Sequence, residues 1–510
     1  MNAHTPDPQA GAWHRRSLLK GGVLGAGLVA GGAAFDIAEA APGTTTRRQW
    51  SGHFRDPNTP DWVYLPFTMP PGVQALEVRY DFHPHDTGLG FSTNVVDIGI
   101  FDSSGRGLGN AAGFRGWSGG ARRHFGITEH WATQGYLAGP LTPGRWHIIL
   151  GPFLITPPGT PYTVTLRLIH GKPVRPRFVA HIAPVAVPGK GAGWYRGDLH
   201  THTIHSDGRW TPSQLVTAAR ARGLDFLGTS DHNTSSSTRV WGRAVPDDFL
   251  LVSGEEVTTR NGHWLSTGTP AGTWVDWRYR AADNQFGRFA DLTRSLGGAA
   301  IAAHPKVPVN GTRWDFGFDD VDALEVWNGP WSLFNQQMVV AWQQLLVAGT
   351  YVPAVGNSDS HRDGQVVGLP MTSYRLGGLT TADVVAAAKG GHAWIAESSS
   401  VDLTFTATGT GATTTVGGPG DTVTLADGEQ LAVHLDVTGV PGTAAQLFGA
   451  GGLLTGAVAD ASGQVVIDTS VAPTEGFVRA EVRRPAGTPD PTGDLSNAPM
   501  VALTNPVFVN

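Results

Sequence analysis

The chain has 510 residues, of which 40% are hydrophobic and 15% are charged, a composition typical of folded globular domains rather than of disordered chains. A formal net charge of -6 argues against a non-specific nucleic-acid binder, which needs a basic surface. Cysteine is absent, so disulfides and thiolate metal sites are excluded, and any metal must be held by nitrogen and oxygen atoms.

Residues 1–40 have the pattern of a twin-arginine export signal. Arg15 and Arg16 precede an apolar stretch at 18–35, and small residues at 38–40 suit cleavage. The alternative is a membrane anchor, but a lysine and many glycines make the stretch weakly apolar for a permanent span. We expect a cleaved signal, no permanent membrane anchor, and a protein that is secreted or resides in the periplasm or cell envelope.

Residues 44–188 show the pattern of an all-β domain. Runs such as "QALEVRYDF" and "YTVTLRLIH" alternate polar and apolar residues and are separated by Pro, Gly and Asn. Helical periodicity is almost absent. This pattern predicts a β-sandwich or jelly roll.

Residues 189–400 alternate predicted helices with apolar runs. "SQLVTAARARG", "FGRFADLTRSLGG" and "LFNQQMVVAWQQLLVAG" read as helices that end at glycine, and "LDFLGT", "AAIAAH" and "YVPAVGN" follow them as buried strands. Alternation of this kind predicts an α/β domain with largely parallel strands, for which a barrel is the natural closed form.

Residues 401–510 return to short alternating runs, such as "LAVHLDVTG", between Gly-, Thr- and Ala-rich turns. They predict a small C-terminal β-sandwich. The expected fold class is therefore multidomain, an α/β unit between two all-β units.

A dense group of titratable residues opens the central domain, in "RGDLHTHTIHSDG" at 196–208. Side chains alternate along a strand, so His200 and His202 are expected to point the same way. Further nitrogen and oxygen donors follow each later apolar run, and the carboxyl ends of parallel barrel strands meet on one face. These donors are Asp231, His232, Glu255 or Glu256, His263, His304, Asp359 and His361. The loop after the first strand adds Asp207, with His205 as a further candidate. They outnumber the ligands of one metal, so we expect a cluster of two or three ions.

Five blocks in this order, "YRGDLHTHTIHSDG", "TSDHN", "GEEVTTRNGH", "AAHP" and "GNSDSH", resemble the motif series of the polymerase-and-histidinol-phosphatase (PHP) superfamily. The arginine-pair leader and the β-rich leading domain resemble the CehA/McbA-like metallohydrolases within it. The resemblance implies a distorted (β/α)7 barrel flanked by the two β-sandwiches, with Mn, Zn or Fe as the metal.

The resemblance also implies how the ligands are shared among the ions. The first metal would take His200, His202, Glu256 and Asp359. The second would share Glu256 as a bridge and add His263 and His304. The third would take Asp207, His232 and His361. Glu256 is preferred to Glu255 because the family places its acid directly before a β-branched residue, here Val257, and because Glu255 would lie on the opposite strand face.

Residues beside the ligands are assigned weaker roles. Asp198 is expected to orient an imidazole, or else to make a strand-end hydrogen bond. His205 is a candidate proton donor, with a solvated loop histidine as the alternative, and Glu325 and Asn328 are expected near the pocket. Four cations adjoin the ligand blocks and are candidates to bind an anionic substrate, or else are ordinary surface charges: Arg209, Arg260, Lys306 and Arg362.

The predicted function is that of an exported hydrolase in which a metal-bound hydroxide attacks an ester, with Glu256 and His205 as the catalytic residues. A phosphoester substrate is favoured by the nearby cations. A carbamate or aryl carboxyl ester of the CehA/McbA type is the alternative, for which Trp327, Trp331 and Phe334 offer an apolar pocket or else barrel packing.

A non-catalytic secreted binding protein on a PHP scaffold is the second class of alternative, and a polymerase-associated nuclease is disfavoured by export and by the acidic charge. The expected partner is a small-molecule ester rather than nucleic acid. The sequence makes no prediction about oligomeric state.

Overall fold

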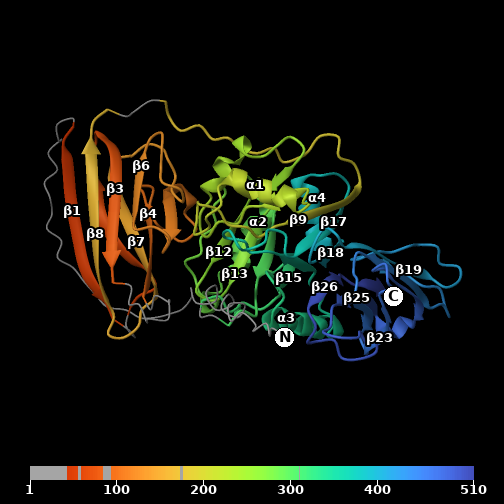
Figure 1. Cartoon of the computed structure of the whole chain (residues 1–510). Helices are drawn as coiled ribbons and strands as arrows, with labels where there is room; N and C mark the ends of the chain where they lie inside the picture. Colours follow the sequence, from red (N-terminus) through yellow and green to blue (C-terminus); the bar gives the residue numbers. More distant parts are fainter. Residues whose placement is uncertain (1–42, 56–58, 84–93, 173–175, 309–310) are drawn as a thin grey trace, which may run out of the picture. The chain divides into compact units, whose positions relative to one another are not determined.

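The computed structural model describes residues 43–55, 59–83, 94–172, 176–308 and 311–510 (Figure 1). The predicted export signal at 1–40 lies outside these residues. The chain divides into two compact units. The first comprises Met1–Val179 with Thr259–Asn261 and Val307–Arg313, and the second comprises Ala180–Thr258, Gly262–Lys306 and Trp314–Asn510.

The first unit contains two four-stranded antiparallel sheets, ordered β1-β8-β3-β6 and β2-β7-β4-β5. Their strands are β1 (Thr45–Phe54), β2 (Val63–Met69), β3 (Val73–Phe82), β4 (Val95–Phe101), β5 (Phe114–Gly119), β6 (His124–Thr128), β7 (Gly144–Leu154) and β8 (Thr160–His170). Side chains from both sheets meet in one hydrophobic cluster that includes Leu76, Ile98 and Ile148. The alternating pattern of the sequence thus provides one apolar face per sheet.

The second unit holds the four α-helices of the described residues: α1 (Pro212–Ala221), α2 (Phe286–Ser295), α3 (Leu333–Val347) and α4 (Thr381–Gly390). Helix α1 begins where the sequence indicates. Thr211 accepts a hydrogen bond from the backbone of Gln214, whose side chain accepts one in return, and Pro212 occupies the first turn. Gly223 follows in the left-handed region, with φ of 74°.

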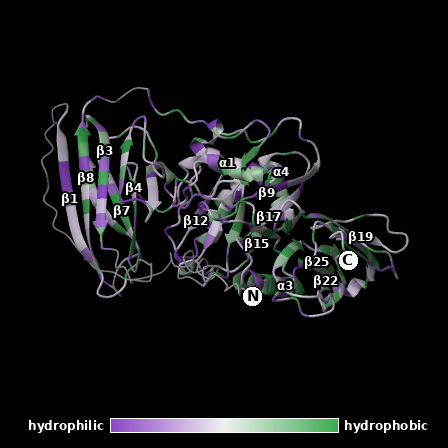
Figure 2. Ribbon diagram, viewed as in Figure 1, coloured by the Kyte–Doolittle hydropathy of each residue, from purple (hydrophilic) through white to green (hydrophobic). Residues whose placement is uncertain are grey.

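The strands of the second unit form three main sheets, and Figure 2 shows hydrophobic stretches along β15 and α3. One sheet is ordered β12 (Gly254–Thr258), β13 (His263–Thr267), β14 (Ala299–Ala303), β15 (Ala323–Asn328) and β16 (Ala354–Asn357). A longer one runs β11 (Leu250–Val252), β10 (Phe226–Gly228), β9 (Gly193–Asp198), β17 (Met371–Leu376), β18 (Ala393–Ala396), β26 (Met500–Thr504), β25 (Phe477–Arg483), β22 (Ala444–Gly449) and β23 (Gly452–Val458). Short strands β20 (Thr422–Val423) and β27 (Val507–Val509) adjoin it, and β19 (Asp402–Gly409), β21 (Leu431–Thr438) and β24 (Val465–Val471) form the third.

The strands are mixed rather than largely parallel. Pairs β9–β10, β10–β11, β14–β15 and β15–β16 are parallel, but β13 is antiparallel to both of its neighbours and β17 is antiparallel to β9. The reason is the segment "GEEVTTRNGH", which folds back as a hairpin with Thr258 opposite His263. The strands that carry the predicted ligands form two sheets linked by isolated bridges, His232 with Glu256 and Thr201 with Ser360, and a single closed (β/α)7 barrel is not shown.

The longer sheet continues across residue 400. Strand β18 pairs with β26 in antiparallel register, Ile395 opposite Leu503. Asn505 adds hydrogen bonds to both backbone groups of Ala354, at 2.8 and 2.9 Å. The C-terminal strands therefore belong to the same compact unit as the strands that carry the histidines.

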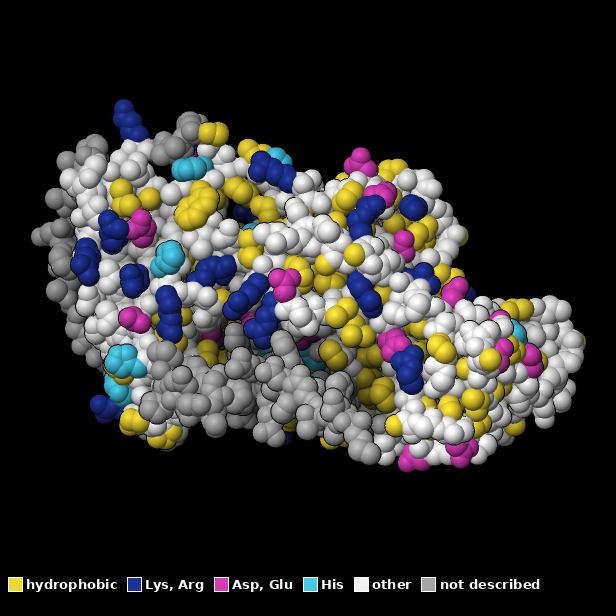
Figure 3. Space-filling view, in the orientation of Figure 1, with side chains coloured by type: hydrophobic (Ala, Val, Ile, Leu, Met, Phe, Trp, Pro, Cys, Tyr) yellow, Lys and Arg dark blue, Asp and Glu magenta, His cyan; other side chains and the backbone are white. Residues whose placement is uncertain are grey.

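The surface visible in Figure 3 shows Lys and Arg side chains scattered among other residues rather than gathered in one stripe. Among the helices of the described residues, none has the length and apolar character needed to cross a membrane.

Candidate metal centre

The segment after β9 holds His200 and His202 by its backbone. The N–H of Leu199 donates to Asn357 Oδ1 at 2.7 Å, that of Thr201 to Ser230 Oγ at 2.9 Å, and that of His202 to the carbonyl of Ser360 at 3.0 Å. The segment runs extended between neighbouring strand ends, so both imidazoles point to the same side, with ring centroids 5.1 Å apart. Both side chains are fully buried.

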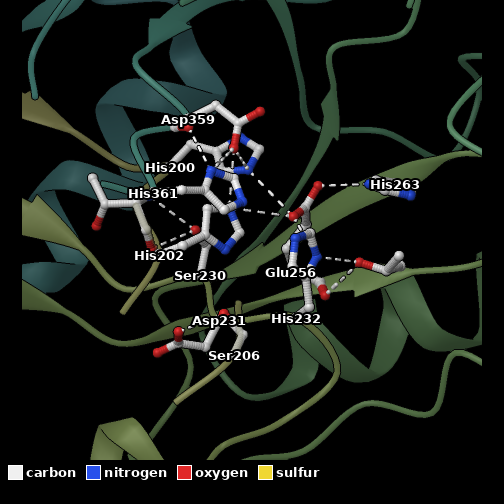
Figure 4. A network of polar contacts seen from close by, with 12 residues as sticks. His200, His202, Ser206, Ser230, Asp231, His232, Glu256, His263, Asp359 and His361 are labelled. Atoms are coloured by element: carbon white, nitrogen blue, oxygen red, sulfur yellow. Dashed lines mark hydrogen bonds and ion pairs between the residues drawn. The ribbon is translucent and has the colours of Figure 1, made fainter. Parts of the chain in front are cut away.

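Glu256 lies at the centre of the histidines (Figure 4). Its two oxygens lie between 2.8 and 3.4 Å from the nearest nitrogens of five imidazoles, those of His200, His202, His232, His263 and His304. The carboxylate itself is fully buried. One carboxylate has about four lone-pair sites, so it cannot hydrogen-bond five imidazoles well at once. This crowding is the geometry of ligands that share cations.

Two further carboxylates complete the cluster. Asp359 Oδ1 lies 3.3 Å from His200 Nε2 and 3.1 Å from His202 Nε2. Asp207 Oδ1 lies 3.5 Å from His232 Nε2 and 3.3 Å from His361 Nε2. Every acid in the cluster thus faces at least two imidazoles.

The nine predicted ligands form four overlapping groups. Within each group, the candidate ligand atoms all lie within 4.8 Å of one another. The groups are His202, Asp207, His232 and His361; His200, His304 and Asp359; His200, His202 and Glu256; and His232, Glu256 and His263. The structure therefore brings the predicted residues together, but it does not divide them into the three sets that the resemblance implies. His202, for example, joins the group of Asp207 as well as that of Glu256.

The donor set fits divalent cations. Four buried atoms of the cluster have no hydrogen-bond partner among the residues that the structure describes, namely Nε2 of His200, Nε2 of His202, Oε2 of Glu256 and Oδ1 of Asp359. Buried polar groups are normally satisfied, and leaving one unsatisfied costs about 1–3 kcal/mol. A shared cation satisfies imidazole nitrogen and carboxylate oxygen together, and both donor types suit Zn, Mn and Fe.

Charge and burial set the protonation of the cluster. Burial, with the positive charges of His361 and His232, lowers the pKa of His202 to about 4. Burial opposes ionisation of Glu256, but surrounding histidines outweigh it and hold the pKa of that carboxyl well below its ordinary value. A neutral imidazole and an ionised carboxylate are the forms that bind metal.

Two of the predicted ligands have unusual backbone conformations. His304 has φ of 35° and Asp359 has φ of 50°, in the left-handed region that non-glycine residues rarely adopt. Each such residue costs of order 1–3 kcal/mol, and such outliers cluster at functional sites. The strain directs both side chains into the cluster.

Glu325 fixes the orientation of His200. Its Oε1 accepts from His200 Nδ1 at 2.8 Å and from Asn357 Nδ2 at 2.8 Å, and its Oε2 accepts from Asn328 Nδ2 and the backbone N–H of His304, each at 3.0 Å. With the proton on Nδ1, Nε2 of His200 is left as the donor atom. Glu325 thus bonds the ligand residues His200 and His304, and Asn328 bonds Glu325. The sequence predicted only that both lie near the pocket. Asn357 was not predicted, although an amide that ends the apolar run "VPAVGN" was a signal.

The carboxylate of Asp198 bonds backbone groups rather than an imidazole ring, so of its two predicted roles the structure shows the strand-end hydrogen bond. It accepts from the backbone N–H groups of His200 at 3.2 Å, Ser358 at 3.1 Å and Gly368 at 2.9 Å. The strand-end role is the one that the structure shows, because the carboxylate turns toward main-chain donors of three segments.

His205 is not a solvated loop residue, because it is 8% exposed and its Nδ1 lies 2.9 Å from Ser236 Oγ. It lies outside the four groups. Asp231 is also outside them and accepts from Thr203 and Ser206, so it organises the loop. Glu255 points away from the histidines and accepts from the backbone of Val275 at 3.1 Å.

The four candidate substrate cations differ in exposure. Arg209, Lys306 and Arg362 are exposed. Arg260 is 4% exposed, and its Nη2 donates to the carbonyl of Pro152 at 3.1 Å while its guanidinium packs against the ring of Phe153. The cation of Arg260 is thus used within the first unit, and its substrate role stays a prediction.

The aromatic residues after β15 are mainly packed. Trp327 is 1% exposed and donates to the carbonyl of Gly329 at 2.9 Å. Trp331 meets it edge to face, with centroids 5.3 Å apart. Packing is thus the role shown for Trp327, while Trp331 and Phe334 keep partial exposure.

No protein-family model matches the chain, and no curated protein matches it. Among solved structures, it is similar to a two-domain protein from Bacteroides vulgatus containing a predicted PHP-like metal-dependent phosphoesterase, at 15% identity over 66% of this chain and 100% of that one, with a TM-score of 0.35. It is also similar to an amidohydrolase from Chromobacterium violaceum, at 19% identity over 34% of this chain and 89% of that one, with a TM-score of 0.26. Both scores are low, so the chemistry below rests on the residues of this chain.

Proposed function

We propose that the protein is an exported metal-dependent hydrolase that cleaves phosphoesters at a centre of two or three divalent ions, on a PHP-type barrel of the CehA/McbA-like kind. The observation that carries the proposal is the buried Glu256 carboxylate, with five imidazoles within 3.4 Å of its oxygens. A scaffold without ions has no use for so many buried ionisable groups, each of which is costly when it lacks a partner.

The nine ligands would hold ions of the Mn, Zn or Fe type: His200, His202, Asp207, His232, Glu256, His263, His304, Asp359 and His361. When bound, such ions lower the pKa of water from 15.7 to about 7 and polarise a phosphoryl oxygen. Glu256, which belongs to two of the four groups, is the natural bridge between neighbouring ions.

The cluster is accessible from one side only. Glu256, His200 and His202 are fully buried, and the side chains of His263 and His304 are 7% exposed. Four others keep exposures between 20% and 25%, namely Asp207, His232, Asp359 and His361. Substrate would therefore reach the centre at the side of Asp207 and His361.

Charge at that side favours an anionic substrate. Arg209 and Arg362 are exposed, and the backbone N–H of Arg209 donates to the carbonyl of His361 at 2.6 Å. Lys306 is exposed two residues after His304. Guanidinium groups recognise phosphate oxygens well, so we assign these three cations to the non-bridging oxygens of a phosphoester.

His205 is our candidate for the group that protonates the leaving oxygen. Its ring is held by Ser236 Oγ at 2.9 Å, and it is not required as a ligand by any of the four groups. Burial opposes ionisation of Asp231, but His205 and neighbouring hydrogen bonds lower the pKa of that carboxyl, so an acid that interacts with His205 lies close to it. A positioned general acid contributes typically 10²–10⁴-fold.

A carbamate or aryl carboxyl ester is the second candidate substrate. The partly exposed ring of Trp331, packed against Trp327 at 5.3 Å, favours it because an aryl group needs an apolar surface. A carboxyl or carbamate ester carries no charge, however, so Arg209, Lys306 and Arg362 would have no anionic group to bind.

The test is elemental analysis of the purified chain, followed by hydrolysis of p-nitrophenyl phosphate, bis-p-nitrophenyl phosphate and p-nitrophenyl acetate with added Mn²⁺ or Zn²⁺. We expect co-purified metal and faster turnover of a phosphate ester than of acetate. Asp359→Asn should lose metal and activity, and Asp363→Asn, an exposed acid four residues on, should keep both. Faster acetate turnover would favour the second substrate, and no turnover at full metal loading would favour a binding protein.

Export is part of the proposal, since the twin-arginine route moves folded proteins and would allow metal loading before export. Replacing Arg15 and Arg16 with lysine should leave the protein in the cytoplasm, as cell fractionation would show. Normal secretion of that variant would contradict the route.

A further inference from the structure

A pocket separate from the nine ligands lies between α3 and the C-terminal strands, which Figure 1 shows beside each other. Its volume is about 510 Å³, within the range of small-molecule sites. One wall is α3, through Gln336, Val340 and neighbouring residues, and the other is formed by β22, β23, β25 and the loop at 492–496. None of its lining residues belongs to the metal centre.

The floor of the pocket is a buried triad of charges on β25. Glu481 lies between Arg479 and Arg483, with nitrogen–oxygen distances of 2.7 and 2.6 Å, and all three residues are at most 4% exposed. The two guanidinium groups share the Glu481 carboxylate, so neither has a buried acid of its own. Asp494 also lines the pocket; it is exposed to solvent, and hydrogen bonds from Ser496 together with the charge of Arg483 lower its pKa. Asp494 thus faces Arg483 rather than Arg479.

Arg479 presents its guanidinium to the pocket. Its Nε donates to Gln343 Oε1 at 2.7 Å and its Nη1 to Glu481 Oε1 at 2.7 Å, whereas Nη2 has no hydrogen-bond partner among the described residues. Arg483 is more fully used, since Nη1 donates to the carbonyl of Ala498 at 2.9 Å and Nη2 pairs with Glu481. A buried charge of this kind is costly unless it is paired.

The pocket lining beside Arg479 is mainly apolar and includes the amide side chain of Gln336. Phe448, Val340 and Leu453 face the pocket, and the guanidinium of Arg479 lies 4.8 Å from the Phe448 ring. Gln336 also lines it, and the buried Oε1 of its amide has no hydrogen-bond partner within the described part of the chain. The pocket therefore offers a cation at its floor, an amide beside it, and a hydrophobic surface toward solvent.

We propose that this pocket is a second ligand site, which takes a small organic carboxylate with an apolar body. The carboxylate accepts from Arg479 Nη2, the donor that Gln343 and Glu481 leave unused, and guanidinium–carboxylate bonds are strong when both groups are desolvated. The apolar body lies against Phe448, Val340 and Leu453. The site is independent of the hydrolytic function.

The test is a fluorine NMR titration of the metal-loaded full chain with 4-fluorobenzoate, with the neutral 4-fluorobenzamide as the matched probe. We expect saturable binding of the carboxylate at one site and binding of the amide weaker by roughly tenfold or more. Arg479→Met should weaken carboxylate binding to a similar extent. It leaves Glu481 paired with Arg483, so no unpaired buried charge threatens the fold.

Two further variants make the result decisive. Arg484→Met removes the next guanidinium of the chain, which pairs with Glu397 outside the pocket, and should leave binding unchanged. Leu453→Trp, at a residue 40% exposed, narrows the pocket without altering the triad and should weaken binding. The proposal is overturned if the wild-type chain shows no saturable binding, if Arg479→Met binds as well as the wild type, or if the amide binds equally. Binding that persists in Arg479→Met but disappears in Asp359→Asn would place the probe at the metal centre and also overturn it.

Discussion

Two adjacent glutamates provide the sharpest test of the metal centre, because they have the same chemistry and opposite surroundings. Glu256 lies among the five imidazoles, whereas Glu255 faces the backbone of Val275 on the other side of β12. Replacing each in turn with glutamine removes a carboxyl group and changes the side-chain volume little. The two variants therefore compare position alone.

Glu256→Gln should abolish both metal binding and catalysis. The residue belongs to two of the four ligand groups, so at least one ion should be lost. Ions in such sites supply several kcal/mol of transition-state stabilisation, which corresponds to a fall in kcat on the order of 10³-fold or more. Without metal, the remaining histidines lose their shared counter-charge, and breaking a buried pair of this kind costs roughly 3–5 kcal/mol in the free energy of unfolding.

Glu255→Gln should keep both metal and activity at neutral pH. Burial, with the nearby charge of Asp276, raises the pKa of Glu255 well above its ordinary value, so folding favours the protonated form. The stability linked to that proton is present below the unfolded pKa and is lost as pH rises through the folded pKa. Glutamine cannot ionise, so the variant should match the wild type near about pH 5 and exceed its stability at alkaline pH.

The assays are metal content by elemental analysis, hydrolysis of p-nitrophenyl phosphate, and denaturant unfolding of EDTA-treated protein at acidic and alkaline pH. Retention of metal and activity by Glu256→Gln would refute the site. Loss of both by Glu255→Gln, with Glu256→Gln intact, would show that the opposite face of β12 carries the chemistry.

Three other predictions concern residues around the cluster. Glu325→Gln places an amide donor against the Asn328 amide and the His304 backbone N–H. Metal affinity should therefore fall roughly 10–100-fold, as measured by competition with a chelator. Unchanged affinity would mean that the orientation of His200 does not matter. Burial opposes the charge on His361, but Asp207 and Asp359 raise its pKa to about 9, so its stabilisation of the metal-free chain should be complete below about pH 6.5 and lost as pH rises through about 9. Thermal unfolding of EDTA-treated protein would show the decline, and His361→Gln should flatten it. Arg260→Ala should lower the free energy of unfolding by about 1–3 kcal/mol and leave KM unchanged. A raised KM with unaltered stability would instead support a role of Arg260 in substrate binding.

The local part of the site was predictable from the sequence. Period-two alternation places His200 and His202 on one side of an extended segment, and the same rule separates Glu256 from Glu255. The gathering of later blocks was also predictable, because each follows an apolar run and parallel strands bring such ends together. The hairpin that reverses the chain before His263 had its own signal, since Asn261-Gly262 is a turn sequence and Gly262 has φ of 124°.

The partners of individual side chains were not predictable. Asp198 and Glu325 are both acids near ligands, yet only Glu325, 125 residues away in sequence, bonds the His200 ring. Arg260 adjoins a ligand block in sequence but donates to Pro152, 108 residues away. Such choices depend on which surfaces meet in the folded chain, and no local pattern records them.

The antiparallel pairing of β18 with β26 means that the part of the chain with the candidate ligands does not end near residue 400. A chain shortened there would expose the unpaired edge of β18, whose main-chain donors and acceptors can pair with other extended segments. It would also lose Asn505, whose hydrogen bonds hold Ala354 at the start of the strand leading to Asn357. The residues after 400 thus complete the sheet to which β9 belongs, and we expect a truncated protein to aggregate.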